Sequence, residues 1–205
     1  MEFKSILPII LAYIVIAPHL SMASADTFYG KFSISPTQQI HFAPGNLQYQ
    51  STTKTWRFAE HQWDYIGDAN KNTSSTYEGW IDLFGWGTGS NPTNVFMDED
   101  AYTTFSDWGN NTISNADGLQ WRTLTNDEWG YVFNERKTVS GIRFAKATVN
   151  GTDANHAGFY GYYWSSTVYS NLDSCGVFFD NRSLFPQSVL LKEYGFSVRL
   201  VCPAE

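Results

Sequence analysis

The residues best suited to catalysis or metal binding are few and widely spaced in this chain. His41, His61 and His156 lie far apart and form no metal-ligand spacing. The acidic triplet at 98–100 offers oxygen ligands for a hard cation such as calcium, but it lacks the spaced ligands of a calcium-binding loop. No nucleophile stands beside a base in a motif such as Gly-x-Ser-x-Gly. The sequence therefore predicts a protein that is not an enzyme, and we expect neither a metal nor another cofactor.

A different chemistry, recognition by aromatic and short polar side chains, is indicated between Val168 and Tyr194. Aromatic rings supply rigid contact area there, and Ser, Asn and Asp supply adaptable hydrogen bonds. The alternative interpretation is an ordinary pair of surface strands joined by loops. The candidate ligand-binding residues are Tyr169, Asn171, Asp173, Phe178, Asp180, Asn181, Arg182, Ser183, Phe185, Leu190 and Tyr194.

The composition is that of one folded domain. The chain has 205 residues, of which 17% are aromatic and only 16% are charged, a balance that argues against disorder. The formal charge of −7 comes without any visible basic patch. This charge argues against binding to nucleic acid or to an anionic membrane surface.

The N-terminus has the pattern of an export signal. Lys4 is followed by an apolar run over Ile6–Ile16 and by the small residues Ala, Ser and Ala at 23–25. An uncleaved membrane anchor is the alternative, but the run is shorter than the roughly 20 residues that span a bilayer. We therefore predict a signal peptide at 1–25 and a single domain at 26–205. The mature chain should have no transmembrane segment and should reach the periplasm, the cell surface or the medium.

Short strands and one helix are predicted to position the recognition segment. Alternating apolar residues predict strands at Phe32 and Ile34, Ile40 and Phe42, Leu47 and Tyr49, and Trp56 and Phe58. The stretch 61–89 is rich in Gly, Asn and aromatic residues, which predicts an ordered, packed loop. A further strand is predicted at 142–149, before an Asn-Gly turn.

The clearest helix begins at Thr125. Thr125 and Glu128 have the spacing of a capping box, in which each side chain accepts a hydrogen bond from the other residue's backbone. Trp129, Val132 and Phe133 then share one face. The basic residues at 136–137 suit the C-terminal end of this helix.

Two further segments enclose the recognition segment. Tyr162, Tyr163 and Trp164 precede it with large rings that we expect to be buried. The apolar residues at 196–201 follow it and predict a closing strand, with Gly195 as a bend.

Several of these segments together resemble a known family. They are FAPGNLQY at 42–49, WRFA at 56–59, WIDLFGWGT at 80–88, WRTLTxxEW at 121–129, GYYWSST at 161–167 and GFSVRLV at 195–201. The chain resembles exported Bacteroidetes proteins of the Fibrobacter major paralogous domain group, and the segment at 121–129 is also similar to sulfatase-modifying-factor domains. The resemblance covers nearly all of 26–205. It implies an α+β, C-type-lectin-like domain with two short helices, a small antiparallel sheet and long ordered loops.

The resemblance also implies a subset of variable proteins whose C-terminal segment is diversified by a retroelement that mutates adenines. Such mutagenesis of Asn codons cannot produce Lys, Glu, Gln, Met or Trp, and the window Val168–Phe185 contains none of these residue types. The expected ligand is a protein or a carbohydrate on a cell or phage surface. Two alternatives are an oxidase of the formylglycine-generating type, which uses two closely spaced cysteines, and a structural surface or fimbrial component.

Aligning Pro186 with the family's proline predicts which side chains point inward. The inward residues are Ser174, Val177, Phe179 and Leu184, and the outward, variable ones are Cys175, Gly176, Phe178, Asp180, Asn181, Arg182, Ser183 and Phe185. Two cysteines in an exported chain suggest a disulfide between Cys175 and Cys202. An outward, variable Cys175 argues against such a bridge. The connection from 150 to 163 is shorter than in many members of the family, which leaves open whether the sheet has all of its core strands.

Overall fold

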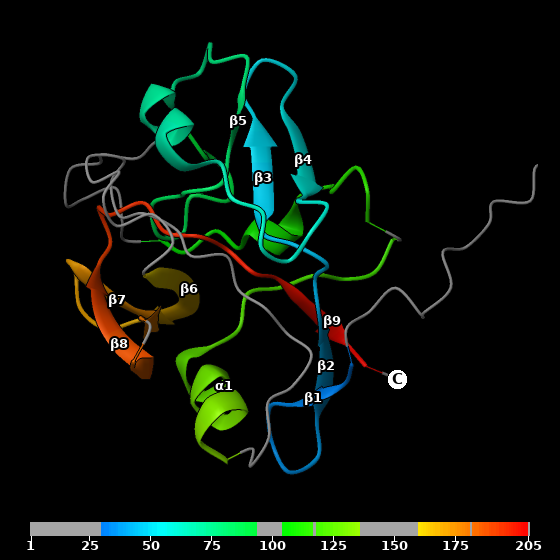
Figure 1. The fold of residues 1–205 in the computed structure, drawn as a ribbon, viewed down its shortest axis with the longest axis vertical. Coiled ribbons are helices and arrows are strands. Elements are labelled where there is room, and N and C mark those ends of the chain that lie inside the picture. The colour runs from blue at the N-terminus through cyan, green and yellow to red at the C-terminus, as the bar shows by residue number, and fades with distance from the viewer. Residues whose placement is uncertain (1–29, 94–103, 117, 136–159, 181, 205) are drawn as a thin grey trace, which may run out of the picture.

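The computed structural model describes residues 30–93, 104–116, 118–135, 160–180 and 182–204, which form an α+β fold with three small antiparallel sheets (Figure 1). The first sheet, in the order β1-β2-β9, contains β1 (Phe32–Ser33), β2 (Gln39–Phe42) and β9 (Val201–Pro203). The second, in the order β4-β3-β5, contains β3 (Leu47–Gln50), β4 (Thr55–Phe58) and β5 (Trp80–Ile81). The third, in the order β6-β7-β8, contains β6 (Gly161–Val168), β7 (Asp173–Phe179) and β8 (Leu184–Leu191).

The described helices are short. They are the 3-10 helices η2 (Gly67–Asn72) and η4 (Trp108–Asn110), the α-helix α1 (Asn126–Gly130) and the π-helical turn η5 (Tyr131–Glu135) that continues α1. The expected α+β class with few helices and antiparallel strands is confirmed. The expected single small sheet is instead three sheets of three strands each.

The predicted N-terminal strands are present where apolar side chains alternate. Ile40 and Phe42 on β2 are buried, as are Leu47 on β3 and Trp56 and Phe58 on β4. Their shared faces cover the core, which is why each strand follows the period of two. The stretch 61–89 contains η2 and β5, so it is more structured than a loop.

The capping box at the start of α1 is confirmed. The Thr125 hydroxyl accepts from the Glu128 N–H at 3.2 Å, and the Glu128 carboxylate accepts from the Thr125 N–H at 2.8 Å. Arg122 donates two further hydrogen bonds of 2.7 Å to the same carboxylate. Trp129 and Val132 are buried on the predicted face, and the predicted end at 136–137 lies outside the described residues.

The closing segment Gly195–Cys202 joins the three sheets and is buried throughout. Its backbone exchanges hydrogen bonds with Phe84 and Arg122 and accepts from Ala43, Leu47 and Trp164. The predicted continuous strand at 196–201 is wrong, because only Val201–Pro203 forms a regular strand. The earlier residues bond to several different neighbours in turn, which prevents one continuous ladder.

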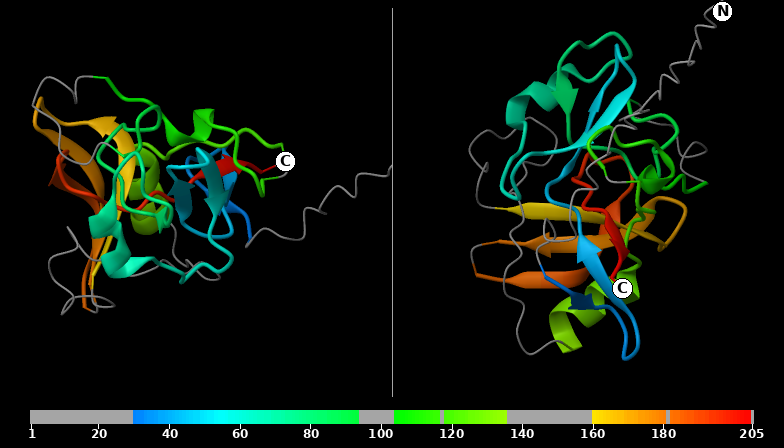
Figure 2. Two further views of the ribbon diagram at one scale, coloured as in Figure 1. Left: turned by 90° about the horizontal axis from the view of Figure 1, so that it is seen from above. Right: turned by 90° about the vertical axis from the view of Figure 1, so that its right-hand side faces the viewer.

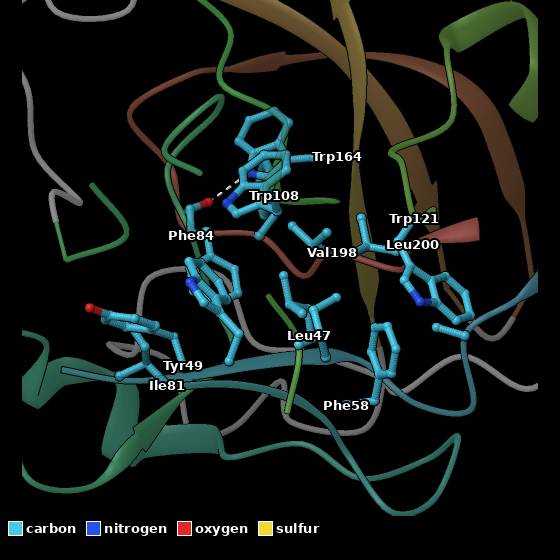
Figure 3. Close-up of a cluster of buried hydrophobic side chains, with 14 of the residues drawn as sticks. Leu47, Tyr49, Phe58, Ile81, Phe84, Trp108, Trp121, Trp164, Val198 and Leu200 are labelled. Carbon is cyan, nitrogen blue, oxygen red and sulfur yellow. Dashed lines mark hydrogen bonds between the residues drawn. The ribbon is translucent and has the colours of Figure 1, made fainter. Parts of the chain in front are cut away.

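A large aromatic core lies between this segment and the β4-β3-β5 sheet. Figure 3 shows Trp108, Trp121 and Trp164 packed with Phe84, Val198 and Leu200 in this cluster. The Trp164 indole donates a hydrogen bond of 2.6 Å to the Phe84 carbonyl, which fixes β6 against the core. A second cluster joins β1 and β2 to α1 and to the face of β6 and β7 that carries Tyr163 and Val177.

Several predictions fall on residues that the structure does not describe. They are the signal peptide at 1–25, the acidic triplet at 98–100, the strand at 142–149, most of the connection from 150 to 163, and the residues His156 and Asn181. Within the described ranges, no helix is long and apolar enough to cross a membrane.

Candidate functional site

The predicted recognition segment forms one side of the β6-β7-β8 sheet and the two connections at its ends. Figure 2 shows these three strands running side by side, away from the β4-β3-β5 sheet. The segment therefore contains two regular strands, β7 and β8, and in the connection between them the structure describes Asp180, Arg182 and Ser183. The segment thus forms two strands, as the alternative interpretation expected, but β7 is largely buried and only β8 is a surface strand.

The middle strand β7 is part of the buried support that holds the exposed surface in place, which we call the frame. Ser174 and Val177 are buried as predicted, and Phe179 packs against Tyr163 with ring centroids 6.1 Å apart. The outward placement of Cys175 and Gly176 is wrong, because both are buried. A Cβ at Gly176 would lie 2.5 Å from the Tyr163 carbonyl oxygen, so this position admits only glycine. The physical reason is that β7 has a neighbouring strand on each side and packed residues on both faces.

The outer strand β8 is exposed along its length. Leu184, Phe185, Val189 and Leu191 keep 43%, 49%, 49% and 37% of their surface accessible. The predicted inward orientation of Leu184 is therefore wrong. Among the described residues β8 pairs only with β7, and α1 contacts it near Gln187, where the Gln187 side chain donates to the Asn126 carbonyl oxygen. The other edge of β8 has no described strand beside it.

Four rings form a continuous stack that leads from the core to β8, which we call the aromatic ladder: Phe196, Tyr162, Phe178 and Phe185. Centroid distances are 4.7 Å from Phe196 to Tyr162, 4.7 Å from Tyr162 to Phe178 and 5.6 Å from Phe178 to Phe185. The angles between these ring planes are 10°, 29° and 8°. The ladder begins at the buried Phe196 and ends at the half-exposed Phe185.

The turn between β7 and β8 is held by Asp180. Its carboxylate accepts from the N–H groups of Arg182 and Ser183 at 2.7 and 2.6 Å, and its own N–H donates to the Ser183 carbonyl at 2.9 Å. Asp180 therefore shapes this connection, while Arg182 and Ser183 are exposed on it.

The Tyr162 hydroxyl stays protonated. Burial raises the pKa of Tyr162, and Tyr160 and Asp180 nearby raise it further.

The opposite end of the sheet presents the loop Tyr169–Leu172. Tyr169 is 65% exposed and Leu172 is 46% exposed, while Asp173 accepts a hydrogen bond of 2.9 Å from the Ser170 hydroxyl. Asn171 is exposed as well. The structure thus places predicted binding residues at both ends of the sheet, with the buried part of β7 between them.

A buried lysine holds this loop. The Lys192 ammonium donates to the carbonyl oxygens of Ser170 and Asn171 at 2.7 and 3.0 Å and lies 4.6 Å from the centre of the Trp86 ring. Burial lowers the pKa of Lys192, and the Asp173 carboxylate opposes that shift. Lys192 was not predicted as a site residue; the available signal was a lone lysine within a segment otherwise poor in charge.

Two predicted binding residues face the core more than solvent. Leu190 is half-buried against the large cluster and lies directly over Gly176. Tyr194 is also half-buried, with its ring 6.0 Å from that of Phe196. Both residues therefore pack against the large aromatic core.

A buried polar centre under β6 also escaped the sequence analysis. The guanidinium of Arg199 donates to the Asn46 side-chain oxygen at 2.9 and 3.1 Å, to the Ala43 carbonyl at 3.3 Å and to the Gln62 carbonyl at 2.8 Å. The Tyr163 hydroxyl donates to the same Asn46 oxygen at 3.1 Å. An arginine within the apolar run 196–201 was the available signal, since a buried charge needs several partners.

The cysteines and histidines do not converge on a reactive site in the described part of the chain. Cys175 and Cys202 are buried and do not form a disulfide, and they lie in different sheets. Burial raises the pKa of Cys175, as does nearby Asp127, which keeps the thiol protonated. Within the described ranges, no three His, Cys, Asp or Glu residues lie close enough together to hold a metal ion.

Comparison of the chain with protein-family models, with curated proteins and with solved structures finds no match.

Proposed function

We propose that this chain is an exported, non-enzymatic binding protein with a C-type-lectin-like fold, which recognises a ligand through the outer surface of the β6-β7-β8 sheet. One observation carries the proposal. Seven of the ten exposed large hydrophobic side chains in the described part of the chain lie between Val168 and Leu191. Clustered exposed apolar residues commonly mark contact sites, whereas scattered ones need no explanation.

The division between frame and surface also supports recognition. Lys192, Arg199 and the aromatic core fix the strands from within, so that exposed side chains lie on a rigid support. A pre-ordered surface loses less conformational entropy when it binds. The exposed groups mix rings with short polar residues, which is the composition of adaptable binding surfaces.

We also propose that this surface is diversified, at fewer positions than the sequence pattern suggested. The loop Tyr169–Leu172 and the stretch 182–185 are exposed and tolerate substitution on physical grounds. Positions 174–177 are buried, so variation there would disturb the frame. We therefore expect variants of this chain to differ mainly at the two ends of the sheet.

The oxidase alternative receives no support from the cysteine arrangement, because the two thiols are buried in separate sheets. A protein ligand and a glycan ligand both remain within the proposal. The surface contains rings, a guanidinium at Arg182 and short polar groups, which suit either chemistry.

The proposal is tested by removing the exposed rings. A double variant, Tyr169→Ala with Phe185→Ala, would be compared with Tyr65→Ala, which removes an exposed ring elsewhere. The probes are a printed glycan array and intact bacterial cells, with labelled protein as the readout. We expect binding of the double variant to fall at least about tenfold while Tyr65→Ala binds normally and all three proteins unfold at similar urea concentrations. Unchanged binding of the double variant would refute the proposed surface.

A further inference from the structure

The aromatic ladder ends at an open position. Tyr162 pairs with Phe178 in the register of β6 and β7, and Phe178 pairs with Phe185 in the register of β7 and β8. Each strand in turn therefore contributes one ring to the stack, and Phe185 on β8 contributes the last ring among the described residues. A further ring in this stack would therefore come from a strand added beside β8.

The stacking also restricts what the rings can bind. A ring binds a sugar through its flat face, but Tyr162 has near-parallel neighbours in Phe196 and Phe178. Phe178 has three such neighbours, since Tyr160 lies 5.9 Å from it in addition to Tyr162 and Phe185, so little of either ring's face is open. These two rings present mainly their edges, which carry the positive side of the ring quadrupole. Phe185 keeps one face without a described ring neighbour. The geometry therefore favours a ligand that adds one flat group to the end of the stack over a glycan laid across several rings.

The strand β8 has the features of an edge that accepts another strand. Its eight residues, Leu184–Leu191, include no charged side chain. Edge strands in soluble proteins are usually protected by lysines, by charges pointing inward or by coverage. Here the protection lies at Pro186, which lacks an N–H, and at Gln187, which contacts α1. β8 also has one more residue than β7 between the pairs Gly176–Ser188 and Phe178–Phe185. A regular edge for backbone pairing therefore remains at Ser188–Leu191.

We propose that β8 binds an extended, uncharged segment of a protein ligand as an added strand, and that an aromatic side chain of this segment stacks on Phe185. The inference rests on the proposed function and names its partner class. Backbone hydrogen bonds at Ser188–Leu191 would supply affinity, and the ring on Phe185 together with contacts to Val189 and Leu191 would supply selectivity. The ring must lie beyond the paired part of the segment, because Pro186 interrupts pairing before Phe185 is reached.

The test uses a synthetic peptide of eight alternating threonine and valine residues with a tyrosine at each end, and a copy with alanine in place of both tyrosines. Amide hydrogen exchange of the mature chain is measured with and without each peptide, and affinities are measured by titration. We expect the tyrosine peptide to slow exchange of alternate amides in Ser188–Leu191, because only alternate residues of an edge strand direct their N–H outward. Loss of the tyrosines should weaken binding about 2- to 10-fold.

Two variants of the protein make the test specific. In Phe185→Ala the two peptides should bind within about twofold of each other, because the stacking partner is gone. Val189→Lys introduces a protective edge charge and should weaken both peptides about tenfold, while Tyr65→Ala should bind them normally.

Three results would overturn the inference. One is unchanged exchange at Ser188–Leu191 with millimolar tyrosine peptide. Another is protection of these amides by raising the protein concentration alone, which would identify a second copy of the chain as the occupant. The third is saturable binding of cellohexaose at Phe185 in place of the peptide. Each of these leaves the proposed function standing, whereas normal ligand binding by the Tyr169→Ala and Phe185→Ala double variant would remove the function itself.

Discussion

β8 and the closing segment Gly195–Cys202 are close in sequence and similar in apolar content, yet their burial is opposite. Every residue of the closing segment is buried, including Arg199, which keeps only 1% of its surface accessible. On β8, which contains no charge, Phe185 keeps 49% of its surface accessible. A charged side chain is therefore inside and an uncharged aromatic one outside.

Position in the fold explains this reversal. The closing segment runs between three sheets and receives hydrogen bonds and side-chain contacts from all of them. β8 forms the outer edge of a sheet and has one described strand neighbour. A group of apolar side chains that stays exposed on such an edge is informative, because exposed apolar patches commonly mark contact sites. We infer that the closing segment serves stability and that β8 serves binding.

The largest loss of stability is expected for the substitution Arg199→Met in the closing segment. It leaves the Asn46 side-chain oxygen and the Ala43 and Gln62 carbonyl groups buried without their guanidinium donor. We expect a loss of about 2–4 kcal/mol in the free energy of unfolding, measured by urea denaturation, because each buried acceptor left without a donor costs about 1–3 kcal/mol. The control Arg182→Met changes the exposed turn and should alter stability by less than about 0.5 kcal/mol. Equal effects of the two variants would contradict the assignment of Arg199 to the frame.

The pH dependence of the frame is expected to come in part from Asp82. Burial raises the pKa of this carboxyl from 3.8 to about 6, although hydrogen bonds from Asn70 and the Ile66 N–H oppose the shift. Between these pH values the folded chain keeps a proton that the unfolded chain has lost, so the contribution of Asp82 to stability is greatest below about pH 4 and falls as the pH rises to 6.

Asp82→Asn tests this dependence, because an amide does not titrate in this range. Relative to the variant, the free energy of unfolding of the wild type should fall by about 3 kcal/mol between pH 4 and pH 7. Urea denaturation at intervals of one pH unit measures the difference. A constant difference across this range would show that Asp82 is not the titrating group.

Lys192 lies between β8 and the closing segment in the sequence, and Lys192→Met tests whether this buried lysine orders the neighbouring loop. The variant keeps the length of the apolar side chain but loses the hydrogen bonds to the Ser170 and Asn171 carbonyl oxygens. We expect a loss of about 1–3 kcal/mol in stability and faster amide exchange in the loop Tyr169–Leu172. The exposed Lys71→Met is the matched control and should leave that exchange unchanged. Unchanged amide exchange of the loop Tyr169–Leu172 in Lys192→Met would show that the loop is ordered without the Lys192 hydrogen bonds.

Apart from the control variants, the smallest effect on stability is expected for Phe185→Ala. This side chain is half-exposed and contacts one described ring, so its removal should cost less than about 1 kcal/mol in the free energy of unfolding. The same variant should nevertheless reduce ligand binding more than any of the frame variants that remain folded. A loss of stability above about 3 kcal/mol would show that Phe185 belongs to the core, and would contradict the assignment of β8 to binding.

Much of the frame was predictable because local patterns carry it. The capping box at Thr125, the alternating pairs on β2, β3 and β4, and the buried Tyr163 and Trp164 are all confirmed. Each depends on spacing within a few residues, and such spacing can be read directly from a sequence. Tyr169 and Phe185 are likewise exposed, as the recognition hypothesis requires.

The errors concern which side of a strand is covered. Cys175 and Gly176 are inside because β7 is the middle strand, and Leu184 is outside because β8 is the outer one. One extra residue on β8 between its pairs with Gly176 and Phe178 also changes the alternation there. A one-residue change in register turns every following side chain to the opposite face. Strand order and bulges depend on contacts between distant segments, so the sequence pattern alone left them undetermined.

The sequence by itself determined the class of fold, the helix start, the aromatic core and the region where polar and aromatic side chains mix. Tertiary structure decided that this region forms two strands, that only its ends and its outer strand reach solvent, and that Lys192 and Arg199 hold it from within. The physical reason is that helix caps and strand alternation are short-range properties. The burial of a strand depends on which neighbours long-range pairing places beside it.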